Sequence, residues 1–263
     1  MVETTAREFP GSKAVSLAKA KEEYFIRFGI SQRVEHLVLM FTFVALALTG
    51  LAEKFYSAGW AEWFINSAGG IATVRLIHRA FGAVFIIGLV YHLGCLTYKI
   101  GFKHGRLTML PSLKDVRDII DSLRYSFGLR DKHIMIGRYD YRQKFEYWGI
   151  LFGGTIMIVT GVMLVYPVWF TSFFPGQFIA AARVAHGNEA MLAVLTVAIW
   201  HLYDVIFKPG IFPADVSIFT GKISRKRMME EHSLEYAEMV EKIGGDPEKI
   251  QDEIEEPNTA SIE

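Results

Sequence analysis

The chain has 263 residues, of which 51% are hydrophobic and 14% aromatic, and its formal net charge is zero. This composition, with its long uncharged runs, indicates membrane spans rather than one soluble core. The single cysteine, Cys95, excludes an internal disulfide, a cysteine-ligated iron–sulfur cluster and covalent haem attachment through a C-x-x-C-H motif. No phosphate-binding glycine-rich loop, hydrolase nucleophile motif or nucleic-acid module is visible, so no nucleic-acid partner is expected.

The predicted elements begin after a polar N-terminal segment, residues 1–33, which has mixed charge and no apolar core or cleavage site typical of a removable secretion signal. Four apolar stretches follow, each close to the ~20 residues that cross a ~30 Å hydrocarbon slab. They run from residues 34 to 52, 76 to 98, 145 to 170 and 184 to 207. The predicted fold is therefore an all-α integral membrane protein, a four-transmembrane-helix bundle over residues 34–207, with a C-terminal tail at 208–263.

The charges between the spans predict the orientation. Residues 99–144 contain eleven Lys or Arg, whereas the connections 53–74 and 171–182 contain only Lys54. By the positive-inside rule the long loop is cytoplasmic, and an even number of spans then places both termini on the cytoplasmic side.

Two soluble segments have a character of their own. In the long loop, "SLKDVRDIIDSLRYSFG" has Ser112 as a candidate N-cap and apolar residues at helical spacing, which predicts an amphipathic helix along the membrane surface. The tail has thirteen Asp or Glu against seven Lys or Arg, and its last stretch is expected to be loosely ordered or bound to a partner.

The chain also shows an internal repeat. "SQRVEHLVLMFTFVALALTG" (31–50) aligns without a gap with "RQKFEYWGILFGGTIMIVTG" (142–161), and "RLIH" (75–78) matches "RVAH" (183–186). His36 of the first repeat is replaced by Tyr147 in the second. We interpret this as a duplicated helix hairpin; convergent use of small residues at helix contacts is the alternative.

Five of the eight histidines fall in the predicted spans, where ionisable groups are expensive and usually functional. They are His36, His78, His92, His186 and His201. The fifteen residues from His186 to His201 correspond to roughly 22 Å and ~60° around a helix, so both can face inward at two depths. The topology puts His78 and His186 in the outer half of the bundle, and His36, His92 and His201 in the cytoplasmic half.

Paired neutral imidazoles in a dry bundle suit haem iron, and six-coordinate iron leaves no position for substrate, so electron transfer is expected. Structural zinc would require four ligands close together. Arginines could bind the haem propionates, because three of them stand three residues before a histidine and a fourth follows one directly. These are Arg33, Arg75, Arg183 and Arg79. Packing histidines and arginines that snorkel to the interface are the simpler explanation of each residue alone.

These motifs resemble those of a known family. "RVEHLVLMFTFVALALTG", "RLIHRAFG", "GRYDYRQK", "TGVMLVYP", "FFPGQ", "HGNEAMLAVLTVAIWHLY" and "TGKISR" are similar to segments of the gamma subunit of membrane-bound respiratory formate dehydrogenases and, more loosely, of the cytochrome b anchors of nickel–iron hydrogenases. The similarity covers roughly residues 30 to 228.

The resemblance implies a bacterial or archaeal inner-membrane cytochrome b with two b-type haems and a site for menaquinone or ubiquinone beside the cytoplasmic haem. It implies His78 and His186 as ligands of the outer haem, and His36 and His201 as ligands of the cytoplasmic one. From the repeat alone, His92 would pair with His201, so His92 stays an alternative or additional ligand. The family's polar residue near the quinone corresponds to Asp140, with Gln143 nearby.

The resemblance also implies partners. They would be a peripheral iron–sulfur or cytochrome c redox subunit on the outer face, with or without a catalytic dehydrogenase subunit. The segment "KPGIFPADVSIF" is longer than its counterpart, so the partner enzyme need not be formate dehydrogenase. The chain itself offers no substrate chemistry. The alternatives are a cytochrome b that oxidises quinol and feeds an external acceptor, and a non-redox transporter or proton channel that uses membrane histidines.

Overall fold

The computed structural model describes residues 24–103, 108–130 and 134–242, which fall into two compact units. The first, here called the bundle unit, comprises residues 30–119 and 140–215. The second unit comprises the described residues of the segments 1–29, 120–139 and 216–263. The predicted loose end of the tail and most of the N-terminal segment lie outside the described residues.

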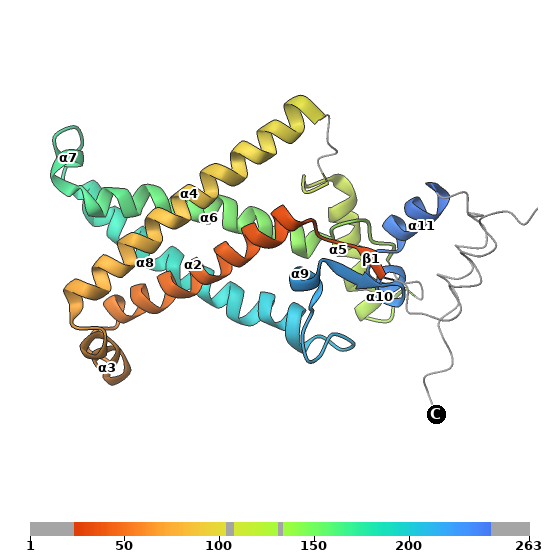
Figure 1. Cartoon of the computed structure of the whole chain (residues 1–263), viewed down its shortest axis with the longest axis horizontal. Helices are drawn as coiled ribbons and strands as arrows, with labels where there is room; N and C mark the ends of the chain where they lie inside the picture. Colours follow the sequence, from red (N-terminus) through yellow and green to blue (C-terminus); the bar gives the residue numbers. More distant parts are fainter. Residues whose placement is uncertain (1–23, 104–107, 131–133, 243–263) are drawn as a thin grey trace, which may run out of the picture. The chain divides into compact units, whose positions relative to one another are not determined.

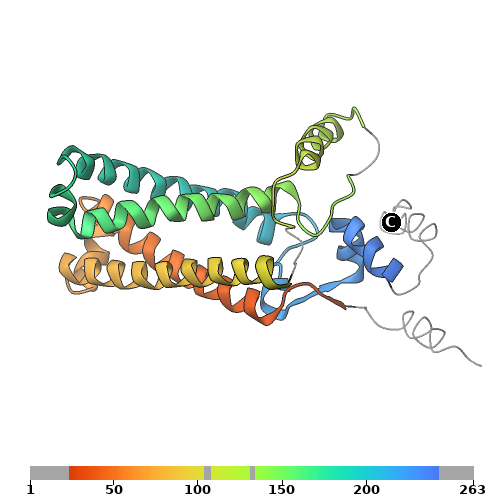
Figure 2. The ribbon, with the colours of Figure 1, turned by 90° about the horizontal axis from the view of Figure 1, so that it is seen from above.

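The bundle unit contains four long helices that run side by side (Figures 1 and 2). They are α2 (Ile30–Lys54), α4 (Ile71–Lys103), α6 (Tyr141–Val165) and α8 (Gln177–Leu195), the last continuing through the π-helical turns η1 (Thr196–His201) and η2 (Tyr203–Phe207). Each is long and apolar enough to cross a membrane. The prediction of four membrane helices is therefore confirmed.

The ends of the helices differ from the predicted runs. The first two helices extend beyond the predicted apolar runs at both ends, because polar residues next to an apolar run can continue the helical backbone. The third ends at Val165, five residues earlier than predicted, since Pro167 has no N–H to donate and starts the short α7 (Pro167–Thr171). The connection after α2 also forms a helix, α3 (Gly59–Ser67).

The outer faces of the bundle are apolar and exposed. Leu76, Ile87 and Val90 of α4 are 69%, 68% and 64% exposed. In water such surfaces would drive association, but in a bilayer they contact lipid. The membrane therefore acts as the solvent of this unit.

Small residues bring the helices together. On α6, a Cβ at Gly154 would lie 2.9 Å from the Phe85 ring of α4. The repeated glycines, Gly50 and Gly161, lie against imidazoles, because a Cβ added to them would be 3.1 Å from Cε1 of His78 and 3.3 Å from Cε1 of His186. Hence the repeat in the sequence corresponds to a repeated contact between a glycine and a histidine ring.

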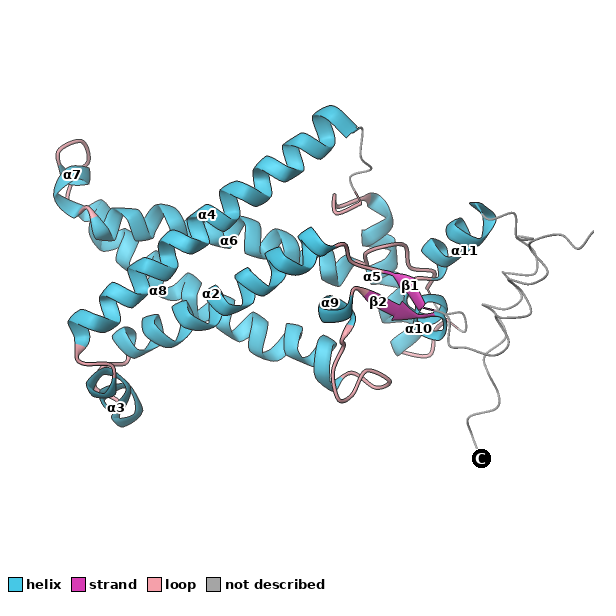
Figure 3. Cartoon of the chain, viewed as in Figure 1, coloured by secondary structure: helices cyan, strands magenta, loops and turns pink. Residues whose placement is uncertain are grey.

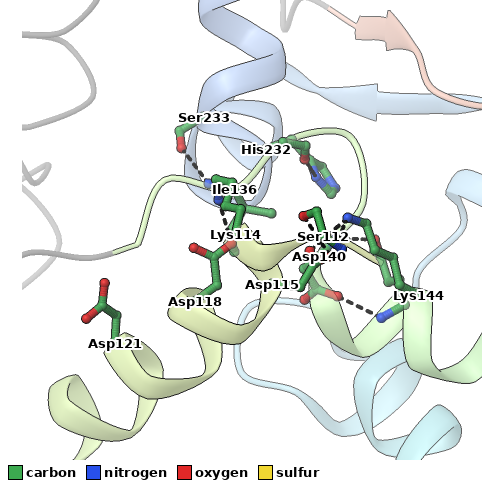
Figure 4. A network of polar contacts seen from close by, with 12 residues as sticks. Ser112, Lys114, Asp115, Asp118, Asp121, Ile136, Asp140, Lys144, His232 and Ser233 are labelled. Atoms are coloured by element: carbon green, nitrogen blue, oxygen red, sulfur yellow. Dashed lines mark hydrogen bonds and ion pairs between the residues drawn. The ribbon is translucent and has the colours of Figure 1, made fainter. Parts of the chain in front are cut away.

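The predicted amphipathic helix is α5 (Leu113–Ser126). The Asp115 carboxylate accepts hydrogen bonds from the backbone N–H of Ser112 at 2.6 Å and from Lys144 Nζ of α6 at 2.7 Å (Figure 4). Burial raises the pKa of Asp115, but the hydrogen bonds from Lys144 and Ser112 outweigh it and leave that pKa below its ordinary value. This ion pair therefore ties the start of α5 to α6.

The second unit joins segments that are distant in the sequence. Strand β1 (Tyr24–Ile26) pairs antiparallel with β2 (Lys222–Ser224) (Figure 3). In this pairing Phe25 lies opposite Ile223. The short helices are α9 (Ser217–Thr220), α10 (Arg225–Glu231) and α11 (Ser233–Lys242). Ile223, Met228 and Tyr236 form the core of this unit.

A polar network lies beside this core. Arg27 is 3% exposed and pairs with Glu235 at 2.6 Å, and Arg138 binds the same carboxylate. His232 is 4% exposed and donates from Nδ1 to the carbonyl of Gly137 at 3.0 Å. Burial, and then the charge of Arg27, lower the pKa of His232 to about 4. Ser233 Oγ accepts from the backbone N–H of Ile136 (Figure 4).

Candidate functional site

Two pairs of histidines face each other inside the bundle unit. The first histidine pair is His78 of α4 and His186 of α8, with ring centres 6.3 Å apart. The second histidine pair is His36 of α2 and His201 of η1, with ring centres 6.2 Å apart. Helices α4 and α8 begin near the first pair, and α2 begins near the second, so the pairs lie at two levels of the bundle.

Hydrogen bonds fix the rings of the first pair. Nδ1 of His78 is 2.8 Å from Thr49 Oγ1, and Nδ1 of His186 is 2.9 Å from Thr160 Oγ1. Each threonine hydroxyl donates its proton to a carbonyl one turn earlier in its own helix. The threonine oxygen can therefore only accept from Nδ1–H, which leaves the lone pair of both rings on Nε2.

The second pair is oriented by a carboxylate on one side. Nδ1 of His201 is 2.9 Å from Glu146 Oε2. Because a carboxylate only accepts, Nδ1 carries the proton and Nε2 is again the free nitrogen. Nδ1 of His36 is buried and has no hydrogen-bond partner among the described residues.

The turns that hold His201 are irregular. Residues 196–201 and 203–207 form π-helical turns that continue α8. Such turns are rare and frequently occur at functional sites, because they change the direction in which the following side chains point. His201 is the last residue of the first such turn.

Both pairs have the spacing of two ligands on opposite sides of one metal atom. A metal–nitrogen bond of about 2 Å, with the ring centre about 1.2 Å beyond the nitrogen, would put the ring centres about 6.4 Å apart. Within the described ranges, no group of three or more His, Cys, Asp or Glu side chains could hold a metal ion. The spacing of the rings fits haem, whose porphyrin would supply the other four nitrogens.

The four arginines expected at propionates are placed differently from one another. Arg75 is exposed and binds Glu53, with 3.1 Å between Nε and Oε2. Arg79 and Arg183 are exposed, whereas Nε of Arg33 is buried. Of these four arginines, only Arg33 is therefore partly buried in the bundle unit.

Among the described residues, the ring that His92 faces is that of Tyr147 and not a histidine. Nδ1 of His92 is 2.8 Å from Glu35 Oε2, and its Nε2 is 3.0 Å from the Tyr147 hydroxyl. Both ring nitrogens are thus engaged by protein groups. The repeat is visible here too, because Glu35 lies on His92 as Glu146 lies on His201, while Tyr147 stands where His36 stands in the first repeat.

Asp140 and Gln143 form the N-terminal cap of α6. Asp140 accepts from the backbone N–H of Gln143 at 2.8 Å, and the Gln143 side chain accepts from the Asp140 N–H at 3.2 Å. Asp140 is 8% exposed, and Arg142 bridges it to Asp204 of η2. This carboxylate is therefore a buried cap in an ion-pair network rather than a solvated loop residue.

The sequence did not single out the side chains that orient the rings. Thr49 and Thr160, and Glu35 and Glu146, are aligned pairs in the repeat. The alignment could have found them, because each glutamate and each threonine lies as many residues from His36 in the first repeat as from Tyr147 in the second.

Comparison with known proteins decides the family. A sequence model described as prokaryotic cytochrome b561 matches residues 27–220. This chain belongs to that family. The family implies haem b and electron transport, and with the four apolar helices it indicates an integral membrane protein of prokaryotes.

Individual relatives support the resemblance. The nitrate-inducible formate dehydrogenase cytochrome b556(Fdn) subunit of Escherichia coli (strain K12) is 23% identical over 220 residues, which cover 84% of this chain and 94% of the relative. The formate dehydrogenase cytochrome b556(fdo) subunit of the same strain is 22% identical over 199 residues, which cover 74% and 85%. The expected similarity to formate dehydrogenase cytochrome b subunits is thereby confirmed.

Proposed function

We propose that this cytochrome b holds two b-type haems and carries electrons between a peripheral redox partner and the membrane quinone pool. The observation that supports this most directly is the presence of two facing histidine pairs at two levels, each spaced for one metal atom. Haem, when bound, supplies reversible one-electron chemistry. As a subunit of a respiratory oxidoreductase complex, the chain would anchor its partners and conduct electrons across the bilayer.

The ligands in this proposal are His78 and His186 for one haem and His36 and His201 for the other. The hydrogen bonds on Nδ1 of His78, His186 and His201 hold those rings in one tautomer and orientation, as outer groups do around other metal ligands. We prefer His36 to His92 because His36 faces His201, whereas both nitrogens of His92 are hydrogen-bonded.

Around the haems, Arg33, Arg75, Arg79 and Arg183 are proposed to bind the propionates. Arg75 would exchange its exposed pairing with Glu53 for a propionate, which costs little because surface ion pairs are weak. Asp140 and Gln143 at the start of α6 are proposed to lie near the quinone, menaquinone or ubiquinone. Their level is that of the second histidine pair, because Arg142 bridges Asp140 to Asp204 of η2, which lies three residues after His201 of η1.

The sides of the membrane follow from charge. Because the loop between α4 and α6 is rich in Lys and Arg, both termini and the second histidine pair are proposed to face the cytoplasm, in the inner membrane. The first pair then faces the outer surface. There the chain would meet an iron–sulfur or cytochrome c subunit, with or without a catalytic dehydrogenase subunit; the relatives are themselves formate dehydrogenase subunits.

A ligand series tests the proposal. Purified protein with adequate haem supply should show b-type bands in reduced-minus-oxidised spectra and two haems per chain. His78→Ala and His186→Ala should each remove the same low-spin signal, and His36→Ala and His201→Ala the other, while His92→Ala should retain both. A wild-type protein without b-haem bands, or a His186→Ala variant with two intact low-spin signals, would contradict it.

A further inference from the structure

The bundle unit contains a further cluster of hydrogen-bonded side chains at the level of the second histidine pair, which the proposed haem sites do not use. It consists of Ser31 and Glu35 of α2, His92 of α4 and Tyr147 of α6. We call it the Tyr147 relay. Three hydrogen bonds link it. Ser31 Oγ donates to Glu35 Oε1 at 2.6 Å, Nδ1 of His92 is 2.8 Å from Glu35 Oε2, and Nε2 of His92 is 3.0 Å from the Tyr147 hydroxyl.

The internal repeat explains why this cluster exists. In one half, Glu146 binds Nδ1 of His201, and Nε2 of that ring is free to face His36. In the other half, Glu35 binds Nδ1 of His92 in the same way, but the residue that faces Nε2 is Tyr147. Here a hydroxyl lies at hydrogen-bond distance from Nε2 and can exchange a proton with it. Beside His201, the equivalent residue is His36, a proposed iron ligand.

The protonation states follow from the donors and acceptors. The Glu35 carboxylate only accepts, so Nδ1 of His92 carries a proton and Nε2 accepts from the Tyr147 O–H. Glu35 also accepts from Ser31, so both of its carboxylate oxygens act as acceptors. Nε2 of His92 is therefore the nitrogen that can exchange a proton with the Tyr147 hydroxyl.

The position of the relay suits proton exchange with water. Glu35 lies five residues into α2, about 8 Å along the helix axis from its start. The His92 side chain is 34% exposed, and Ser31 is exposed in the first turn of α2. The relay therefore runs from the end of the bundle unit to Tyr147, which lies one turn beyond Gln143 on α6.

We propose that Tyr147 and His92 pass protons between the quinone site and water at this end of the bundle. In quinol oxidation the two electrons would pass one at a time to the oxidised haems of the proposed function. With each electron, Tyr147 takes a proton from the quinol hydroxyl as its own phenolic proton moves to Nε2 of His92. One O–H bond of the quinol breaks, one N–H bond forms on His92, and Tyr147 is neutral before and after. The imidazolium, whose Nδ1–H stays on the unchanged Glu35 carboxylate, then loses the Nε2 proton to water, which restores the acceptor for the Tyr147 hydroxyl.

The same steps reversed deliver a proton to a reduced quinone, and two passes complete a quinone–quinol conversion. This inference rests on the proposed function, because it requires a quinone site near Gln143. Glu35 acts as a positioning residue: it holds the His92 ring and its charge but does not exchange the proton itself.

The test compares Tyr147→Phe and His92→Gln with wild-type holoprotein and with Tyr166→Phe, a matched control at the exposed far end of the same helix. Haem content and dithionite-reduced spectra are measured first. Reduction of the oxidised haems by duroquinol in a stopped-flow spectrometer should then be at least about tenfold slower in both relay variants, as expected for loss of a proton-transfer group. Wild type should show a solvent deuterium isotope effect, and Tyr166→Phe should behave as wild type.

A second readout does not depend on turnover. Redox-induced infrared difference spectra of wild type should contain tyrosine and imidazole bands, of which the tyrosine bands are absent from Tyr147→Phe and retained in Tyr166→Phe. Rates and bands equal to wild type in Tyr147→Phe would overturn the relay. So would loss of a haem in both relay variants, which would indicate a structural role. If wild type contains haem that duroquinol does not reduce, the proposed quinone function fails and the relay fails with it.

Discussion

Thr49 and Thr160 show how one hydroxyl sets the chemistry of a neighbouring ring. Each gives its proton to its own helix and so must accept from a histidine Nδ1–H. A ring that donates from Nδ1 is more basic at Nε2, which favours the oxidised, more positive iron. Hence these threonines should affect the redox potential of the haem that is proposed at the first histidine pair.

Replacing Thr160 by Val removes the acceptor and keeps the shape of the side chain. We expect Thr160→Val to raise the midpoint potential of one haem, by about 60 mV for each tenfold loss of preference for the oxidised form. A spectroelectrochemical titration measures it. Thr160→Ser, which keeps the hydroxyl, should titrate as wild type; equal potentials in Val and Ser variants would show that the hydrogen bond has no such effect.

His232 should make the second unit sensitive to acid. Its pKa is about 4 in the folded state against an ordinary 6.5, because of burial and then the Arg27 charge. A depressed histidine pKa contributes stability that is complete above pH 6.5 and is lost as the pH falls towards 4, and the full contribution is about 3 kcal/mol.

Hydrogen–deuterium exchange of peptides from α10 and α11 can measure this effect, with His232→Asn as reference. The asparagine amide can still donate to Gly137 but does not titrate. The protection of wild type relative to His232→Asn should fall between pH 7.5 and pH 5. A constant ratio over that range would contradict the assigned pKa.

Among helices, close approach depends on glycine at the contact with a ring. A Cβ at Gly161 would lie 3.3 Å from His186, whereas one at Gly149 on the same helix would meet nothing within 4 Å. Gly161→Leu should therefore displace His186 and reduce haem content by about one per chain, while Gly149→Leu should retain wild-type content. Pyridine haemochrome assay on purified protein measures both, and unchanged content in Gly161→Leu would contradict the contact.

The helices show what a sequence can and cannot predict. The four spans were predictable because a run of apolar side chains in lipid must form a helix to satisfy its backbone. The pairing of β1 with β2, over almost two hundred residues, was not, since neither three-residue strand has a pattern of its own. The π-helical turns at His201 were also not predictable, because they follow from packing within the bundle.

The candidate site was predictable in its histidines and not in its surroundings. Ionisable residues in apolar runs stand out one by one, so all five membrane histidines were identified. The surroundings depend on how neighbouring helices are rotated. This rotation decides that Thr49 contacts His78 and that Tyr147 contacts His92. The repeat aligned these residues but could not say which partners face each other.

In the molecule as a whole, duplication and asymmetry separate two tasks. The first histidine pair joins equivalent positions of the two repeats, whereas the second pair joins positions that are not equivalent. The replacement of a second histidine by Tyr147 leaves His92 for another use. One level of the bundle is thus symmetric, and the other is divided between the proposed haem ligands His36 and His201 and the proposed Tyr147 relay.

The orientation of the whole bundle unit can be tested with cysteine reporters in a Cys95→Ala background. Ser57 and Ser172 lie exposed in the connections beside α3 and α7, and Ser126 lies exposed at the end of α5. Because the loop between α4 and α6 is the one rich in Lys and Arg, Ser57→Cys and Ser172→Cys should react with a membrane-impermeant maleimide added to intact spheroplasts, and Ser126→Cys only after lysis. The opposite pattern would reverse the proposed sides and put the second histidine pair and the Tyr147 relay at the outer face, so that quinone protons would be exchanged there. Labelling of all three before lysis would instead contradict a four-span topology.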